Sequence, residues 1–202
     1  MASAMSRRER LSLLFDHLPL GPIVLDASAI INLLGCGDFQ GVLKALGAAC
    51  VVEQRTLNEV HRHPVPGSDH GTVLEELGTL GMLKVVRMTG EEYETYLSLV
   101  QGSITSRLDN GESAAIALTT RGLPIVLDEN KARGVVARAY PNVNFCSTLR
   151  LFLTAGKRGA WSTGHVQKLV LSARQHARMG VPRDDRELLG TLMTGVEGWK
   201  TN

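Results

Sequence analysis

The stretch 22-PIVLDASAIINLLG-35 decides the expected fold. An apolar run ends in one carboxylate, Asp26, and a helical pattern from Ala29 to Leu34 follows without a glycine turn. A short apolar run that leads into a helix in this way indicates a buried strand of a parallel sheet. Asp26 and Ser28 can both cap the helix, so the acid has a local explanation as well as a functional one.

The same alternation of strand and helix continues along the chain. Strand-like runs are expected at 22–26, 48–52, 83–87, 125–127 and around 143–145. Helical patterns lie between these runs and after residue 147, and a short amphipathic helix is expected at 6–18. The alternation predicts an α/β protein: a three-layer α/β/α sandwich with a parallel sheet of four or five strands and extra helices at both ends.

Length and composition are typical of one domain. The chain has 202 residues, of which 44% are hydrophobic but only 4% aromatic, so aliphatic side chains must fill the core. We expect a single domain over 1–202. Its core is expected at 22–146, with an N-terminal helical extension at 1–21 and a C-terminal helical extension at 147–202.

The cysteines and the hydropathy predict a cytoplasmic protein. Cys36, Cys50 and Cys146 lack C-x-x-C spacing, which favours reduced thiols in the core over a disulfide or zinc framework. No apolar run approaches the roughly 18 residues of a membrane span. Asp16 and His17 interrupt the apolar stretch near the N-terminus, so a secretory signal is not expected.

A cluster of histidines raises the question of a zinc site. His61, His63 and His70 fit no standard zinc spacing, and two prolines lie among them. We therefore expect a surface loop in this segment.

Charge is uneven along the chain. Residues 1–102 contain 8 basic and 12 acidic residues, whereas residues 103–202 contain 14 basic and 8 acidic residues. A basic half can attract a polyanion such as RNA, but a solvated basic surface explains the same excess. Charge alone does not decide between the two.

Four acids lie where functional groups gather in an open α/β sheet. Asp26 and Asp128 each follow a strand, Glu59 lies one turn into the helix after the second strand, and Glu112 opens a later helix. Because the carboxyl ends of parallel strands share one edge, the four could converge there. Each acid alone has a simpler explanation, as a helix cap or a solvated residue. The repetition of acids at strand ends favours a common site.

Crowded carboxylates point to a definite chemistry. They repel one another unless they bind protons or a cation. Oxygen ligands without nearby His or Cys suit Mg²⁺ or Mn²⁺. Such an ion can bind phosphate oxygens and activate water for in-line attack, so the pattern indicates metal-dependent phosphodiester hydrolysis.

Four segments carry a resemblance to a known family: IVLDASAIINLL, TLNEV, GESAAIAL and IVLDENKARGVV. In this order and spacing they resemble the PIN domain family, metal-dependent nucleases that include the toxins of many prokaryotic toxin–antitoxin pairs. The resemblance covers roughly residues 22–146. It implies a parallel sheet flanked by helices, and an acidic pocket that binds Mg²⁺ or Mn²⁺ and cuts RNA.

The resemblance implies roles for individual residues. Asp26, Glu112 and Asp128 would coordinate the metal. Glu59 would complete the catalytic acids, as a further ligand or by orienting water. Ser28 matches the small hydroxyl residue that commonly follows the first aspartate.

Supporting residues are expected around these acids. Glu129 is a candidate for an extra ligand or a supporting acid. Three cations, Arg107, Lys131 and Arg133, are expected to line the approach and to hold the nucleic-acid backbone. An ordinary polar helix face explains the cations equally well.

The expected function is that of a metal-dependent endoribonuclease, the toxin of a toxin–antitoxin pair. RNA is the expected substrate, and a small antitoxin protein or a second copy of the chain the expected partner. The segments before residue 22 and after residue 147 depart from the compact toxins of the family. An alternative from another class is a PIN-like module that binds RNA or a protein without cleaving it.

Overall fold

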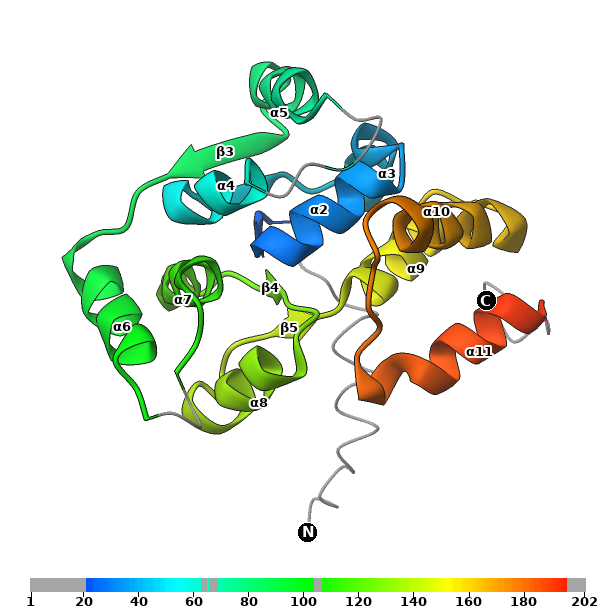
Figure 1. Ribbon diagram of the computed structural model, residues 1–202. Helices are drawn as coiled ribbons and strands as arrows, with labels where there is room; N and C mark the ends of the chain where they lie inside the picture. The colour runs from blue at the N-terminus through cyan, green and yellow to red at the C-terminus, as the bar shows by residue number, and fades with distance from the viewer. Residues whose placement is uncertain (1–20, 63–64, 66–68, 104–106, 196–202) are drawn as a thin grey trace, which may run out of the picture.

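The computed structural model describes residues 21–62, 65, 69–103 and 107–195. Strands and helices alternate along them, as expected, and Figure 1 shows helices on both sides of the sheet. The helix expected at 6–18 lies outside the described residues.

Five parallel strands form one sheet: β1 (Ile23–Leu25), β2 (Cys50–Glu53), β3 (Leu83–Val86), β4 (Ile125–Val126) and β5 (Phe145–Cys146). Their order is β3-β2-β1-β4-β5, and every pairing is parallel. The α/β sandwich with a parallel sheet is therefore confirmed. Because all the strands run the same way, the residues that follow them share one edge.

Ten α-helices and two 3-10 turns occupy the described residues. They are α2 (Ala27–Gly35), α3 (Phe39–Leu46), α4 (Gln54–Val60), α5 (His70–Thr79), α6 (Gly90–Val100), α7 (Asn110–Ala117), η1 (Leu118–Arg121), α8 (Asn130–Ala139), α9 (Thr148–Arg158), α10 (Thr163–His176), η2 (Arg183–Asp185) and α11 (Arg186–Thr194). In Figure 1, α6, α7 and α8 lie on one side of the sheet, and α2, α3, α9 and α10 on the other.

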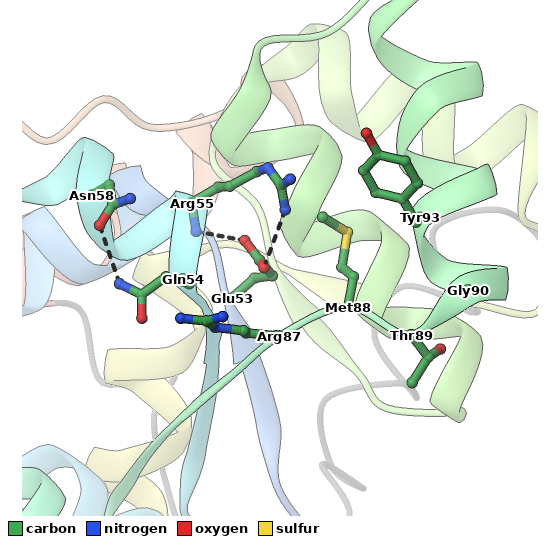
Figure 2. Close-up of a pocket in the computed structure, with 9 residues that line it drawn as sticks. All are labelled: Glu53, Gln54, Arg55, Asn58, Arg87, Met88, Thr89, Gly90 and Tyr93. Atoms are coloured by element: carbon green, nitrogen blue, oxygen red, sulfur yellow. Dashed lines mark hydrogen bonds and ion pairs between the residues drawn. The ribbon is translucent and has the colours of Figure 1, made fainter.

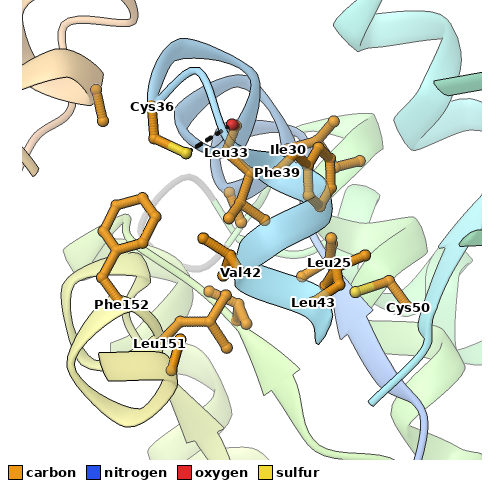
Figure 3. Packing of buried hydrophobic residues seen from close by; sticks show 14 of the residues in the cluster. Leu25, Ile30, Leu33, Cys36, Phe39, Val42, Leu43, Cys50, Leu151 and Phe152 are labelled. Atoms are coloured by element: carbon orange, nitrogen blue, oxygen red, sulfur yellow. Dashed lines mark hydrogen bonds between the residues drawn. The ribbon is translucent and has the colours of Figure 1, made fainter. Parts of the chain in front are cut away.

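Alternate strand residues fill two apolar clusters. Ile23 and Leu25 join the cluster under α2, α3, α9 and α10, whereas Val24 joins the cluster under α7 and α8. Figure 3 shows Leu25 with Val42 of α3 and Phe152 of α9 in the first cluster. Burying each such side chain contributes roughly 1.5–3 kcal/mol. Burial of both faces explains why β1, β2 and β4 read as apolar runs, whereas β3 at the edge of the sheet is largely exposed.

Helix boundaries follow local signals in the sequence. Asp26 caps α2, because its Oδ1 accepts a hydrogen bond from the Ala29 N–H at 2.7 Å. Thr89 and Glu92 form a capping box at the start of α6. Gly122 ends η1 with a φ of +76°, a conformation that other residues rarely adopt.

The three cysteines are free and buried, as predicted. Burial raises the pKa of the Cys36 thiol to about 12, and it also raises the pKa values of Cys50 and Cys146. These thiols stay protonated near neutral pH and pack as small apolar residues.

His70 departs from the surface loop that we expected. It is buried at the start of α5, and its Nε2 accepts a hydrogen bond from the Val65 N–H at 2.7 Å. The imidazole therefore satisfies a buried backbone donor of the preceding loop. His63 lies outside the described residues.

None of the described helices is long and apolar enough to cross a bilayer alone. α2 and α3 reach the required length and apolarity only as a pair, and the two helices are bent by 111°. Both bury apolar side chains in the core, such as Leu33 and Leu43.

The segment before α11 is tied to the end of β5 by a buried carboxylate. Asp185 is fully buried, and its Oδ2 accepts a hydrogen bond from Ser147 Oγ at 2.6 Å. Its Oδ1 accepts from Arg150 Nε, also at 2.6 Å. These bonds join η2 to the start of α9, which packs on the sheet.

Replacing Asp185 with Ala is expected to lower the free energy of unfolding by about 3 kcal/mol, because the half-buried Arg150 guanidinium and the buried Ser147 hydroxyl both lose this acceptor. Urea denaturation measures the change. Asp184→Ala, at the exposed neighbouring position, is the control and should stay within about 0.5 kcal/mol of the wild type. Equal stability of the two variants would contradict the anchoring role.

Candidate functional site

Two aspartates lie on adjacent strands at the carboxyl edge of the sheet. Asp26 directly follows β1, Asp128 lies two residues beyond Val126 of β4, and Leu25 pairs with Val126. Burial, and after it the charge of Asp128, raise the pKa of Asp26 to about 8. The fold thus holds two acids close together with too little solvent to stabilise both charges.

Asp26 is oriented by its own helix start. Ser28 Oγ donates to the two carboxylate oxygens at 3.0 and 2.9 Å, and the Ala29 N–H donates to Oδ1. These bonds act against burial and lower the Asp26 pKa. Among the described residues, only the Ser28 hydroxyl donates to Oδ2, which leaves lone pairs free for a ligand.

Asp128 is held by two residues that sequence reasoning missed. Asn32 Nδ2 of α2 donates to its Oδ2 at 2.8 Å. Thr148 donates twice, from its N–H to Oδ1 at 2.8 Å and from its Oγ1 to Oδ2 at 2.5 Å. Burial raises the Asp128 pKa, and these bonds oppose the rise. The sequence did contain a signal for Asn32, because it is a polar residue within an otherwise largely apolar helix.

Glu112 comes from the first turn of α7 and meets Glu129, the residue before α8. Burial, and after it the hydrogen bond with Glu129, raise the pKa of Glu112 to about 9. The charge of Asp26 acts in the same direction, so Glu112 belongs to the same electrostatic cluster. Two carboxyl groups joined in this way share a proton, which a cation could replace.

Glu59 of α4 lies against the start of α7. A Cβ atom at Gly111 would overlap Glu59 Oε2, so glycine leaves the space that this carboxylate occupies. Thr56 Oγ1 donates to the Gly111 carbonyl at 3.0 Å and holds α4 close to α7. The charge of Glu59 contributes to the raised pKa of Asp26. The structure therefore brings all four predicted acids, and Glu129, to one edge.

The donor set suits a hard divalent cation. It contains only carboxyl oxygens. Burial and the neighbouring carboxylates raise the pKa values of Asp26 and Glu112, so these acids hold protons near neutral pH that a cation could replace. No three His, Cys, Asp or Glu side chains within the described part of the chain are already grouped closely enough to hold an ion. Binding an ion therefore requires some movement of these side chains.

Of the three predicted cations, Arg107 and Lys131 are exposed, whereas Arg133 is only 6% exposed. Arg133 Nη1 donates to the Leu127 carbonyl at 3.1 Å, and its guanidinium lies 5.1 Å from the centre of the Phe145 ring. This position in the protein interior corrects the expectation that Arg133 contacts RNA. The long Arg133 side chain, on the amphipathic helix α8, points into the protein and not into solvent.

A pocket of about 640 Å³ lies at the same edge of the sheet, where Glu53 ends β2 and Arg87 follows β3. Figure 2 shows the residues that line it. They are Glu53, Gln54, Arg55, Asn58, Arg87, Met88, Thr89, Gly90 and Tyr93. Glu53 ends β2, and continuing the register of Val24 with Val51 places it beside Asp26. Sequence reasoning missed Glu53, although an acid at the end of an apolar strand was the signal that identified Asp26.

A family model described as a PIN domain matches residues 22–181. The chain therefore belongs to the PIN domain family, whose members are generally nucleases and usually bind divalent metals. The matched range includes the sheet and continues through α9 and α10. Comparison with curated proteins and with solved structures gave no match.

Proposed function

We propose that this protein is a metal-dependent endoribonuclease that hydrolyses RNA phosphodiester bonds. The convergence of Asp26, Glu59, Glu112 and Asp128 at one edge carries the proposal. The raised pKa values of Asp26 and Glu112 support it, because crowded buried acids are costly in a site without a function for them. Membership of the PIN domain family agrees with this chemistry.

The proposal assigns a role to each acid. Asp26, Glu112 and Asp128 would hold Mg²⁺ or Mn²⁺, and Glu59 would orient water or act as a further ligand. The bound ion would supply charge neutralisation at the phosphate and an activated water. Glu129 would act as an extra ligand, or would hold Glu112 in position through the hydrogen bond between them. Because several acids lie close together, we assign the proton acceptor to no single one of them.

Residues around the acids would position them and the substrate. Ser28 orients Asp26, and Thr148 orients Asp128, through hydrogen bonds that are already formed. Fixed carboxylates bind a small, hard ion with less loss of side-chain freedom. The exposed cations Arg107 and Lys131 would contact phosphates without reading the base sequence.

Incubation of the purified chain with labelled RNAs tests the proposal. We expect cleavage with Mn²⁺ or Mg²⁺, none with chelator, and none by Glu112→Gln. Glu94→Gln, an exposed change on α6, is the matched control and should cleave as the wild type does. Cleavage that survives chelator would contradict the metal mechanism. RNA binding without cleavage under every ion would support a non-catalytic module instead.

Replacing Gly111 with Ala is expected to reduce cleavage about 10- to 100-fold, the usual effect of disturbing a group beside a metal site. The added methyl must displace the end of the Glu59 side chain, which can rotate away, so the melting temperature should change little. Gly134→Ala is the control, because it meets open space in α8 and should leave cleavage unchanged. If Gly111→Ala cleaved RNA as the wild type does, Glu59 would have no role in cleavage.

We further propose that the protein acts in the cytoplasm as the toxin of a toxin–antitoxin pair. Free, buried cysteines suit a reducing compartment, and the family includes such toxins. Expression alone should arrest growth, and co-expression with a small antitoxin from the adjacent gene should restore it. An active nuclease without effect on growth would contradict the toxin role alone.

We also propose a second copy of the chain as a partner. Measuring the molecular mass of the purified protein in solution tests whether it forms a dimer.

A further inference from the structure

The pocket lined by Glu53 lies one strand away from the acidic site. β2 neighbours β1, so Glu53 and Asp26 end adjacent strands about 4.8 Å apart. Arg87 follows β3, the next strand along the same edge. A ligand in the pocket would therefore lie beside whatever occupies the acidic site.

One carboxylate oxygen in this pocket has no hydrogen-bond partner among the residues that the structure describes. Glu53 is only 1% exposed, and its Oε2 accepts a hydrogen bond from the Arg55 N–H at 2.5 Å. Its Oε1 is buried and accepts no hydrogen bond within the described part of the chain, although it forms an ion pair with Arg55 Nη1 at 3.6 Å. A buried acceptor without a donor costs about 1–3 kcal/mol, so a ligand with an N–H group would be stabilised there.

Flat surfaces and positive charge accompany this oxygen. The Tyr93 and Tyr96 rings are stacked with centres 5.7 Å apart, and the Arg55 guanidinium lies 5.6 and 5.0 Å from the two centres. Tyr93 keeps 42% of its surface exposed. In Figure 2, the Arg55 guanidinium lies near the Tyr93 ring, and Arg87 lies apart from both, below them in the view. Aromatic and guanidinium planes of this kind stack on nucleobases.

The pocket is joined rigidly to the acidic site. Tyr96 OH donates to Asn110 Oδ1 at 2.9 Å, and Asn110 begins α7 just before Gly111 and Glu112. The spacing between the tyrosines and the catalytic acids is therefore set by packed helices and not by a loop. A nucleotide held in the pocket would fix the position of its neighbouring phosphodiester bond.

We infer that this pocket binds one base of the RNA next to the bond that is cut, and that it selects a base with N–H donors. Glu53 Oε1 accepts from the base edge, Tyr93 and Arg55 stack on its face, and Arg87 contacts a phosphate. Guanine presents two adjacent N–H donors and is preferred. Uracil, whose single N–H lies between two carbonyl acceptors, is disfavoured. This inference rests on the proposed function, because it takes RNA as the ligand.

Binding of short RNAs in chelator tests the inference without any need for cleavage. The probes are an oligouridine of about six nucleotides and the same oligomer with one internal guanine, followed by fluorescence anisotropy. Wild-type protein should bind the guanine-containing probe about tenfold tighter. Glu53→Gln should reduce this preference to about twofold or less, because the amide replaces half of the carboxylate's acceptors with a donor.

A second variant and a control complete the test. Tyr93→Ala, at an exposed position, should weaken binding of both probes about tenfold through lost stacking. It keeps the inference testable if Glu53→Gln fails to fold. Glu76→Gln, an exposed change on α5, should bind both probes as the wild type does.

The outcomes separate this inference from the proposed function. No binding of either probe, or an equal guanine preference in folded Glu53→Gln, would overturn the base pocket even if the protein cleaves RNA. A guanine preference that Glu53→Gln removes would support the pocket even if the protein cleaves nothing with Mn²⁺ or Mg²⁺, and only the nuclease proposal would then fail.

Discussion

Replacing Asp26 with Asn is expected to reduce RNA cleavage by about 10³-fold or more, because several kcal/mol of metal-dependent stabilisation are lost and each 1.36 kcal/mol is tenfold in rate. The same variant is expected to be more stable than the wild type in chelator. Asn keeps a side-chain oxygen that can accept from the Ala29 N–H, and it removes a carboxyl group that is costly to ionise beside Asp128. Activity and stability should therefore change in opposite directions.

The gain in stability should depend on pH. The Asp26 pKa is about 8 in the folded protein and 3.8 for the free side chain, so the folded state keeps a proton that the unfolded state has lost. Stability of the wild type therefore falls as pH rises from about 4 to 8. The stability of the Asn variant does not fall in this way, so the difference in stability between the variant and the wild type should be largest near pH 8.

Thermal unfolding at about pH 5 and about pH 8 in chelator measures the effect. A gain of 1–2 kcal/mol corresponds to roughly 3–6 °C for a chain of this length. Asp26→Ala is the control, since it removes the same charge but also the helix cap, worth about 1 kcal/mol. An Asn variant less stable than the wild type at the higher pH would contradict the charge crowding described for this site.

Adding Mn²⁺ or Mg²⁺ is expected to raise the melting temperature strongly at about pH 8 and little at about pH 5. The pKa values of Asp26 and Glu112 are raised to about 8 and about 9, so at the lower pH protons occupy the oxygens that an ion needs. At 100 times its dissociation constant, an ion that binds only the folded state stabilises it by about 2.7 kcal/mol, which is roughly 5–10 °C here.

Titration of the ion during thermal unfolding checks this prediction, and calorimetry in buffers of different ionisation enthalpy should show proton release on binding. Glu112→Gln should lose most of the shift in melting temperature. Glu91→Gln, an exposed change in the first turn of α6, should keep it. An equal shift at both pH values, or in both variants, would mean that the ion binds elsewhere.

The sequence pattern was sufficient for the order and type of most elements. Apolar runs with alternate residues buried on two faces predicted the strands, and caps such as Asp26 and Gly122 marked helix ends. The last strand was expected around 143–145 but spans Phe145–Cys146. Its position is set by pairing of Ile125 with Phe145, a contact between distant segments that local hydropathy does not specify.

The site was predicted in part. Asp26 and Asp128 were found because acids that end buried strands stand out in a sequence. Arg133 was placed wrongly, because a long amphipathic side chain can turn inward or outward from the same helix position. Asn32 was missed, because its partner Asp128 is 96 residues away in the chain.

By itself the sequence determined which segments form strands and helices, and that acids follow the strands, because these depend on patterns within a few residues. Only the tertiary structure decided which acids are neighbours. The strand order β3-β2-β1-β4-β5 places Asp26 between Glu53 on one side and Asp128 on the other. Strand order depends on which distant apolar faces pack together. This packing places Asp26 and Asp128 in the acidic cluster and Glu53 in the neighbouring pocket.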